Sequence, residues 1–287
     1  KAALRFAEWR CAVGARGQFP VFLVRARDSW YHRGSGKSVH GCAKGTAEMN
    51  EMNVPVGVSN FEKIRKNGYY YIDKSELIRE LLSNTGTKAT VITRPRRFGK
   101  TLGMSMLESF FDIRKDSRKL FEGLEIAENQ ALCDAWMNQY PTAFVSFRQV
   151  DGLDFAGAYD MLTWVISELY KSHLYLLDSD KIDNTDKDIA KQLARGNASL
   201  KDTKGSLMLL TRMMQQHYGK PVILLIGEYD VPVAKANNNG YYNEMLDVMK
   251  GLMQALKDNQ ALRFAVVTGC LKIAKESIFT GTNNFVS

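Results

Sequence analysis

The sequence predicts an α/β domain with a mainly parallel sheet, and three observations support this class. Short apolar runs typical of buried strands recur along the chain and alternate with stretches at helical spacing. The run at residues 221–226 is apolar throughout, which indicates a strand buried on both faces, as in the middle of a parallel sheet. The stretch at residues 88–101 joins a β-branched run, a turn and the start of an amphipathic helix.

The composition is that of an ordinary globular protein, and its basic charge is confined to one end. With 287 residues, of which 45% are apolar and 24% charged, the chain can bury the core of one large domain or two small ones. Residues 1–50 hold nine of the 39 Lys and Arg residues and three of the 31 acidic residues. Residues 51–287 are close to neutral, which gives no global support for nucleic-acid binding by that part.

The first 50 residues form a region of their own. Arg, Gly and Ser mix there with isolated aromatic residues, and neither a strand period nor a helix period persists. We expect a basic leader that is disordered or was added by cloning, with Met49 or Met52 as a natural start. The alternative is a basic arm that contacts nucleic acid.

Cysteine spacing and hydropathy limit the kinds of protein to consider. The four cysteines form no C-x-x-C pair and have no histidine at ligand spacing, which argues against a zinc site or a disulfide framework. They are Cys11, Cys42, Cys133 and Cys270. Scattered thiols fit a reducing compartment, and no apolar run approaches the ~20 residues that cross a bilayer. We therefore expect a cytoplasmic protein without a membrane partner.

From residue 54 onward, strand and helix signals alternate. Asp73 and Glu76 have the spacing of a helix N-cap, and that helix ends near Leu82. The run at residues 88–93 is the first strand. Further strands are expected at 142–147, 221–226 and 263–268, helices after Thr101 and at about 156–173, 186–194, 204–218 and 241–257, and an Asn-rich loop at 237–240.

Gly99, Lys100 and Thr101 stand where the first strand passes into the following helix. In a phosphate-binding loop, backbone N–H groups face an anion, the lysine reaches the β- and γ-phosphates, and the hydroxyl takes a magnesium ligand position. The pattern G-x-x-x-x-G-K-[ST] places its first glycine at Arg94, where Pro95 favours extended conformations. The backbone must therefore pass from the strand into the loop in a different conformation from that of the standard pattern. The alternative is a basic turn in which Gly-Lys-Thr occurs by chance.

Polar side chains follow the third and fourth predicted strands. Glu228 and Asp230 come directly after the third strand, and Thr268 ends the fourth. Because parallel strands present their carboxyl ends at one edge, where doubly wound sheets bind ligands, we expect these side chains near the phosphate-binding loop. The alternative for Glu228 and Asp230 is a plain role as polar residues at a strand end.

Four segments resemble, in order, the AAA-ATPase-like domain family, a domain that often precedes a PD-(D/E)xK-type nuclease domain in prokaryotic proteins. These segments are Tyr71–Ser75, Ile92–Leu102, Glu228–Pro232 and Thr268–Phe279. The likeness covers about residues 53–287. The Arg-Pro-Arg-Arg sequence at residues 94–97 is similar to the family's own variant of the Walker A motif, so the missing first glycine is expected.

The resemblance implies a P-loop NTPase domain of AAA type. Such a domain has three layers and a mainly parallel sheet, in which the strand with a polar sensor residue separates the Walker A and Walker B strands. The resemblance also implies ATP as ligand and Mg²⁺ as cofactor. The implied nucleotide-binding residues are Asp73, Arg94, Pro95, Arg96, Arg97, Phe98, Gly99, Lys100, Thr101 and Leu102.

The resemblance also assigns roles in catalysis and metal binding. Lys100 would hold the β- and γ-phosphates, Glu228 would activate water, and Thr268 would be the sensor. Thr101 would bind magnesium. Asp230 is not assigned by the resemblance, and we expect it to act through water in place of the metal ligand that Gly227 lacks.

Two departures from the family pattern limit these expectations. Gly227 stands where the family has an aspartate that helps to hold magnesium, so we expect impaired hydrolysis. No segment shows the nuclease signature, so we expect a fragment that lacks the nuclease domain.

Three functions follow from the sequence. The first is ATP binding with Mg²⁺-dependent hydrolysis that is weakened by Gly227. The second is a nucleotide-binding regulatory or scaffold module that does not hydrolyse ATP. The third is a DNA-binding accessory domain of a nuclease system. The expected partners are a nucleotide and, in a full-length protein, a C-terminal nuclease domain or further copies of the chain.

Overall fold

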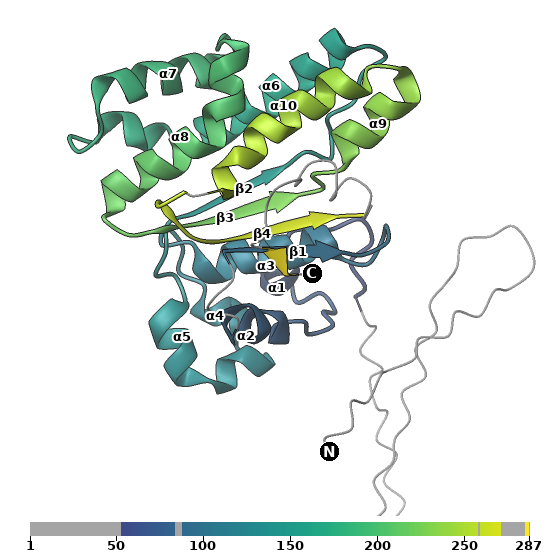
Figure 1. The fold of residues 1–287 in the computed structure, drawn as a ribbon. Coiled ribbons are helices and arrows are strands. Elements are labelled where there is room, and N and C mark those ends of the chain that lie inside the picture. The colour runs from purple at the N-terminus through teal and green to yellow at the C-terminus, as the bar shows by residue number, and fades with distance from the viewer. Residues whose placement is uncertain (1–52, 84–87, 258, 271–284, 287) are drawn as a thin grey trace, which may run out of the picture. The chain divides into compact units, whose positions relative to one another are not determined.

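The computed structural model of the chain describes residues 53–83, 88–257, 259–270 and, for the backbone alone, 285–286 (Figure 1). All described elements belong to the unit Glu51–Ser287. The expected basic leader at residues 1–50 lies outside the described ranges and stays a prediction.

A parallel sheet forms the centre of this unit. Its strands are β1 (Ala89–Thr93), β2 (Thr142–Ser146), β3 (Val222–Gly227), β4 (Leu262–Gly269) and β5 (Phe285–Val286). They pair in the order β2-β3-β4-β1-β5, and every neighbouring pair is parallel. This confirms the predicted α/β class and parallel sheet. Strand β4, which carries Thr268, lies between β1 and β3, as the resemblance implied.

The register aligns the carboxyl ends of the strands. Thr93 of β1 pairs with Gly269 of β4, and Ser146 of β2 pairs with Gly227 of β3. The segments that follow these four strands therefore leave the sheet at one edge. That edge is where the sequence places its polar residues.

Helices cover both faces of the sheet (Figure 1). One layer consists of α1 (Phe61–Lys66), α2 (Glu76–Ser83), α3 (Lys100–Phe111), α4 (Arg118–Phe121) and α5 (Gln130–Trp136). The other consists of α6 (Phe155–Lys171), α7 (Asn184–Arg195), α8 (Leu200–Tyr218), α9 (Val231–Asn239) and α10 (Tyr242–Met253). Three 3-10 helices, η1 (Glu125–Glu128), η2 (Leu174–Asp178) and η3 (Gln254–Leu256), complete the described elements.

Strand β3 is buried along its whole length and divides the core in two. Val222, Leu224 and Ile226 pack into the cluster that includes α6, α8 and α10. Ile223 and Leu225 pack into the cluster that includes α3. This alternation follows from the two-residue period of a strand, and it confirms the prediction of a strand buried on both faces.

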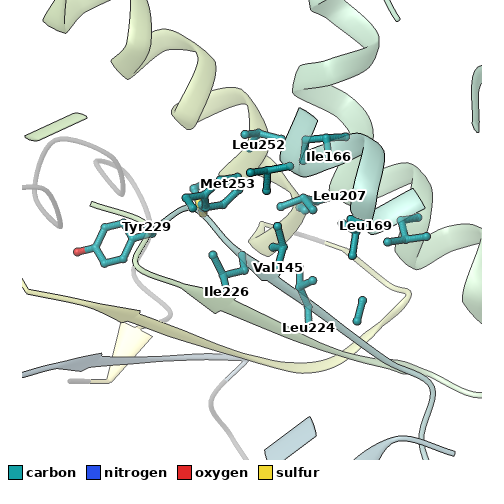
Figure 2. Packing of buried hydrophobic residues seen from close by; sticks show 14 of the residues in the cluster. Val145, Ile166, Leu169, Leu207, Leu224, Ile226, Tyr229, Leu252 and Met253 are labelled. Carbon is teal, nitrogen blue, oxygen red and sulfur yellow. The ribbon is translucent and has the colours of Figure 1, made fainter. Parts of the chain in front are cut away.

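Figure 2 shows how the first of these clusters fills the space between the sheet and the helices. The labelled side chains come from the strands (Val145, Leu224 and Ile226), from the turn after β3 (Tyr229), from α6 (Ile166 and Leu169), from α8 (Leu207) and from α10 (Leu252 and Met253). Burying one such side chain fully stabilises the fold by about 1.5–3 kcal/mol. The strands that end at the carboxyl edge of the sheet are therefore anchored in a well-packed core.

Most predicted elements are confirmed to within a few residues, and one region is corrected. The Asn-rich segment at residues 237–240, predicted as a loop, contains the end of α9. Pro232 lies in the first turn of α9, where the missing proline N–H needs no partner, and Gly240 ends the helix with φ 85°. The helix expected at 241–257 ends at Met253 and continues as η3.

His173 lies between α6 and η2 and is 4% exposed. Its Nδ1 atom lies 2.9 Å from the Leu169 carbonyl oxygen, which can only accept a hydrogen bond, so Nδ1 carries the proton of the neutral ring. Burial lowers the pKa of His173 from 6.5 to about 4, because the buried ring cannot be hydrated when charged. The fold therefore favours the neutral histidine.

We predict that His173 makes the fold sensitive to acid between pH 6.5 and about pH 4. In this window the unfolded chain binds a proton that the folded chain does not, so stability falls as the pH falls, by up to about 3 kcal/mol. Urea unfolding of the wild type and of His173→Gln at about pH 7.5 and about pH 4.5 measures the effect. The variant should lose less stability between the two pH values, and equal losses would contradict the assignment.

Candidate functional site

The loop at residues 94–99 joins β1 to α3 at the carboxyl edge of the sheet. The Arg94 N–H donates to the Gly269 carbonyl oxygen at 3.2 Å, which continues the pairing of β1 with β4. Helix α3 is fixed by burial, since its side chains from Met104 to Phe111 pack against the sheet and α1. The loop is thus held at both ends.

The backbone conformation of this loop shows how the chain passes from β1 to α3 without the first glycine of the Walker A pattern. Positive φ occurs at Arg97 (69°) and at Gly99 (74°), and not at Arg94. Arg97 therefore adopts the left-handed conformation for which glycine is normally needed, at a cost of roughly 1–2 kcal/mol. This confirms the expectation that the loop starts in a different backbone conformation from that of the standard pattern.

The Lys100 ammonium lies within the turn of the loop. It donates to the carbonyl oxygens of Arg94 at 2.8 Å and Pro95 at 2.9 Å, and it lies 3.1 Å from the Cys270 Sγ atom. A single cation therefore bridges the start of the loop and the segment that follows β4.

The first turn of α3 presents backbone N–H groups without a side-chain cap. Gly99 takes the N-cap position and has no side chain to accept from them. The first N–H groups of a helix have no acceptor within it, and the helix dipole adds partial positive charge at this end. The side chains of Arg94, Arg96 and Arg97 are exposed beside them. Together these groups suit an anion.

Thr101, Glu228 and Thr268 come together from three different elements. The Thr101 Oγ1 atom lies 3.4 Å from Glu228 Oε1, and the Glu228 N–H lies 3.4 Å from Thr268 Oγ1. Glu228 has a φ of 53°, an uncommon value for a residue other than glycine, which places it in a sharp turn after β3. The predicted proximity of these three residues is confirmed.

Asp230 lies two residues after Glu228, and its carboxylate binds the backbone of the segment that follows β4. It is 2% exposed, and its Oδ2 atom accepts a hydrogen bond from the Cys270 N–H at 2.8 Å. This contact fixes the chain where it leaves β4. A role for Asp230 in binding magnesium stays a prediction.

The Asp73 carboxylate is engaged by backbone groups on both of its oxygens. Oδ1 accepts from the Ser75 N–H at 2.8 Å and Oδ2 from the Glu125 N–H at 2.7 Å. Burial raises the pKa of Asp73, but these N–H groups outweigh burial and hold the pKa below its ordinary value. Asp73 thus ties the start of α2 to η1, and its expected contact with a nucleotide stays a prediction.

Gly227 ends β3 beside Ser146 of β2. A β-carbon added at Gly227 would lie 3.2 Å from Ser146 Oγ, 3.3 Å from Ser146 Cβ and 3.4 Å from a ring carbon of Phe144. By the alternation of β3, position 227 lies on the same face as Ile223 and Leu225, which is the face covered by α3. A side chain at 227 would therefore point towards the layer that carries the loop.

Sequence reasoning missed two residues of the site, Gly269 and Cys270. A β-carbon added at Gly269 would lie 2.5 Å from the ring of Tyr229 and 2.8 Å from Asp230 Oδ1, so any other residue requires these side chains to shift. Cys270 contacts both Lys100 and Asp230. Their place directly after Thr268, at the end of the fourth predicted strand, was the available signal.

Within the described ranges, no three His, Cys, Asp or Glu side chains gather as a metal site. In the same part of the chain, no helix combines the length and the apolar character needed to span a membrane.

The structure is a parallel α/β domain with a loop at the carboxyl edge of its sheet, where exposed arginine side chains and the uncapped first turn of α3 come together. Residues 55–279 match the model of a family described as "Predicted AAA-ATPase", and the chain belongs to this family. This confirms the family resemblance.

One curated relative is an uncharacterized protein in the vnfD 5′ region of Azotobacter chroococcum mcd 1. It is 28% identical over 239 residues, which cover 82% of this chain and 40% of the relative. The chain thus spans less than half the length of this relative. No solved structure matches the chain.

We predict that Gly269→Ala destabilises the fold, since the new methyl group would overlap the buried Tyr229 ring. The expected loss in the free energy of unfolding is about 1–3 kcal/mol. Gly205→Ala in α8 is the control, because a β-carbon there meets nothing within 4 Å and should stabilise the helix by about 0.5–1 kcal/mol. Urea unfolding of both variants checks this, and an unchanged Gly269→Ala midpoint would show that Tyr229 can move aside.

Proposed function

We propose that this chain is a P-loop domain of AAA type that binds ATP with Mg²⁺ and hydrolyses it slowly. One observation carries the proposal: the Lys100 ammonium and the uncapped first turn of α3 meet at a single loop. The placement of β4 between β1 and β3, with helices on both faces of the sheet, supports the AAA type. Membership of the "Predicted AAA-ATPase" family supports it independently.

The triphosphate would lie against the loop at residues 94–99. Backbone N–H groups of Gly99 to Leu102 would donate to it, and the Lys100 ammonium would exchange its carbonyl acceptors for β- and γ-phosphate oxygens. The exposed side chains of Arg94, Arg96, Arg97 and Phe98, with Pro95, would line its approach. This arrangement supplies several donors and at least two kinds of positive charge to one anion.

Magnesium, when bound, would neutralise charge that develops on the phosphate oxygens. The Thr101 hydroxyl suits a ligand position, and Glu228 beside it suits the orientation of the attacking water. The Thr268 hydroxyl oxygen would hold Glu228 in place by accepting from the Glu228 backbone N–H. Asp230 is the remaining carboxylate near this group, and its contribution to the metal would pass through water.

Gly227 is the reason to expect slow turnover. Glycine has no side-chain oxygen to place on the face of the sheet that carries the loop, whereas an aspartate side chain there could hold the metal or its waters. This favours a second candidate function, a nucleotide-binding regulatory or scaffold module with no useful hydrolysis. The contacts to phosphate do not involve position 227, so binding is common to both candidates.

The remaining proposals concern the setting of the domain. The relative is more than twice as long as the matched stretch, which leaves room for a further domain, and by resemblance we propose a C-terminal nuclease domain or self-association in the full-length protein. DNA binding as a nuclease accessory domain is the weaker alternative, given the near-neutral charge of residues 51–287. Free thiols at Cys133 and Cys270 support a reducing, cytoplasmic location.

We predict that Lys100→Ala abolishes detectable ATP binding and leaves the fold intact. The substitution removes the ammonium at the helix N-terminus, the position where phosphates are expected. Isothermal titration calorimetry with ATP and Mg²⁺ measures the loss, and circular dichroism checks the fold. Lys201→Ala, an exposed position on α8, is the matched control and should bind as the wild type does. Equal affinity in Lys100→Ala would overturn the assignment of the loop.

We predict that Gly227→Asp raises the rate of ATP hydrolysis by about tenfold or more, with a much smaller change in affinity. The new side chain requires a small shift of Ser146, because its β-carbon would lie 3.2 Å from the Ser146 hydroxyl oxygen. Steady-state phosphate release in Mg²⁺ measures the gain. Gly227→Asn is the matched control, since it has the same shape without the charge and should show no gain.

Glu228→Gln combined with Gly227→Asp should remove the gain, because Glu228 is the proposed water-orienting group. The account of Gly227 fails if the wild type already turns over at roughly 1–100 per second and Gly227→Asp changes nothing.

A further inference from the structure

The segment before α2 reaches the loop at residues 94–99 through one side chain. The Lys74 Nζ atom lies 3.0 Å from the position that a β-carbon on Gly99 would occupy. Lys74 is distant from the loop in sequence, so this approach is a product of the fold. Gly99 therefore serves two requirements, a left-handed backbone and room for the Lys74 ammonium.

The backbone on either side of Lys74 is fixed. The Asp73 carboxylate accepts from the N–H groups of Ser75 and Glu125, and the Ser75 hydroxyl oxygen accepts from the Ile126 N–H at 3.1 Å. Ser75 is fully buried. The segment is thus bound to η1, and the backbone of Lys74 cannot move away from η1 without breaking these bonds.

The Lys74 ammonium has no counter-charge in the described part of the chain. It is exposed and makes no hydrogen bond or ion pair with any described residue. The nearby Asp73 carboxylate is occupied by the backbone. The Lys100 ammonium donates to carbonyl oxygens of this loop, and Arg97 is part of it, so Lys74 adds like charge to a region that is already basic. Such an arrangement is unfavourable unless an anion of several charges joins it.

We propose that Lys74 is a second phosphate-binding lysine of this site. This inference rests on the proposed function and deepens it. The ligand class it defines is a nucleoside polyphosphate, because Lys74, Lys100 and the three arginines of the segment 94–97 together carry more positive charge than the about −2 of a single phosphate. Asp73 is then a positioning residue, which acts on the ligand only by holding Lys74 in place.

Lys74→Met tests this, since it keeps the apolar stem and removes the charge. Binding of a fluorescent ATP analogue to the full chain should weaken about 10- to 100-fold, the range expected for a lost charged hydrogen bond. Lys201→Met is the matched control and should leave affinity unchanged. Displacement of the analogue by inorganic tripolyphosphate should weaken in parallel in Lys74→Met, whereas displacement by adenosine should not.

Asp73→Ala separates positioning from direct contact. It should weaken binding by itself, and it should add nothing in the background of Lys74→Met, because both changes remove the same interaction. Losses that add would overturn the positioning role of Asp73. As a measurement without any substitution, ATP should slow acetylation of Lys74 in the wild type, read by peptide mass spectrometry, and should leave Lys201 unaffected.

The outcomes distinguish this inference from the proposed function. If the wild type binds no nucleotide, the proposed function fails and the inference falls with it. If the wild type binds ATP and Lys74→Met binds equally well, or if ATP does not protect Lys74, the inference alone is overturned.

Discussion

The burial of α3 against the sheet fixes the candidate site. Phe110 and Phe111 are fully buried, and their rings contact Phe121 and Phe264 at centroid distances of 5.2 Å and 5.6 Å. Aromatic contacts of this kind add about 0.5–1.5 kcal/mol each beyond the burial of area. The N-terminus of α3 cannot move without exposing these rings to water, so the donors of its first turn are held rigidly before any ligand arrives. Preorganised donors of this kind lose little entropy on binding.

The end of β4 links the other parts of the site. Gly269 accepts from Arg94 of the loop, Thr268 accepts from Glu228 after β3, and the Cys270 N–H donates to Asp230. Three successive residues at the end of β4 therefore join two segments that are remote in sequence, the loop at residues 94–99 and the turn after β3. A shift of the loop would be transmitted through these bonds to the turn that carries Glu228.

The elements and the site were predictable where the signal is local. The apolar run of β3, the Gly-Lys-Thr sequence and the Thr268 strand end each carry their own pattern, and the parallel register brings them to one edge. The rest depends on contacts that no local pattern encodes. The hydrogen bond from Glu125 to Asp73 spans 52 residues.

The close packing of Tyr229 on Gly269 likewise depends on how two adjacent strands end. Helix α9 was missed for a different reason. Asparagine has low helix propensity, and tertiary packing together with Pro232 and Gly240 overrides it.

The two glycines at the carboxyl edge differ in what their surroundings would accept. At Gly269 any larger residue meets the ring of Tyr229 at 2.5 Å, whereas at Gly227 a β-carbon would lie 3.2–3.4 Å from the Ser146 side chain and the Phe144 ring, which need to give way by only a few tenths of an ångström. Packing therefore restricts position 227 less than position 269. A glycine codon can become an aspartate codon by a single base substitution, so an acidic residue at this strand end is within one mutational step of the present sequence. The same substitution at position 269 would overlap the buried ring of Tyr229.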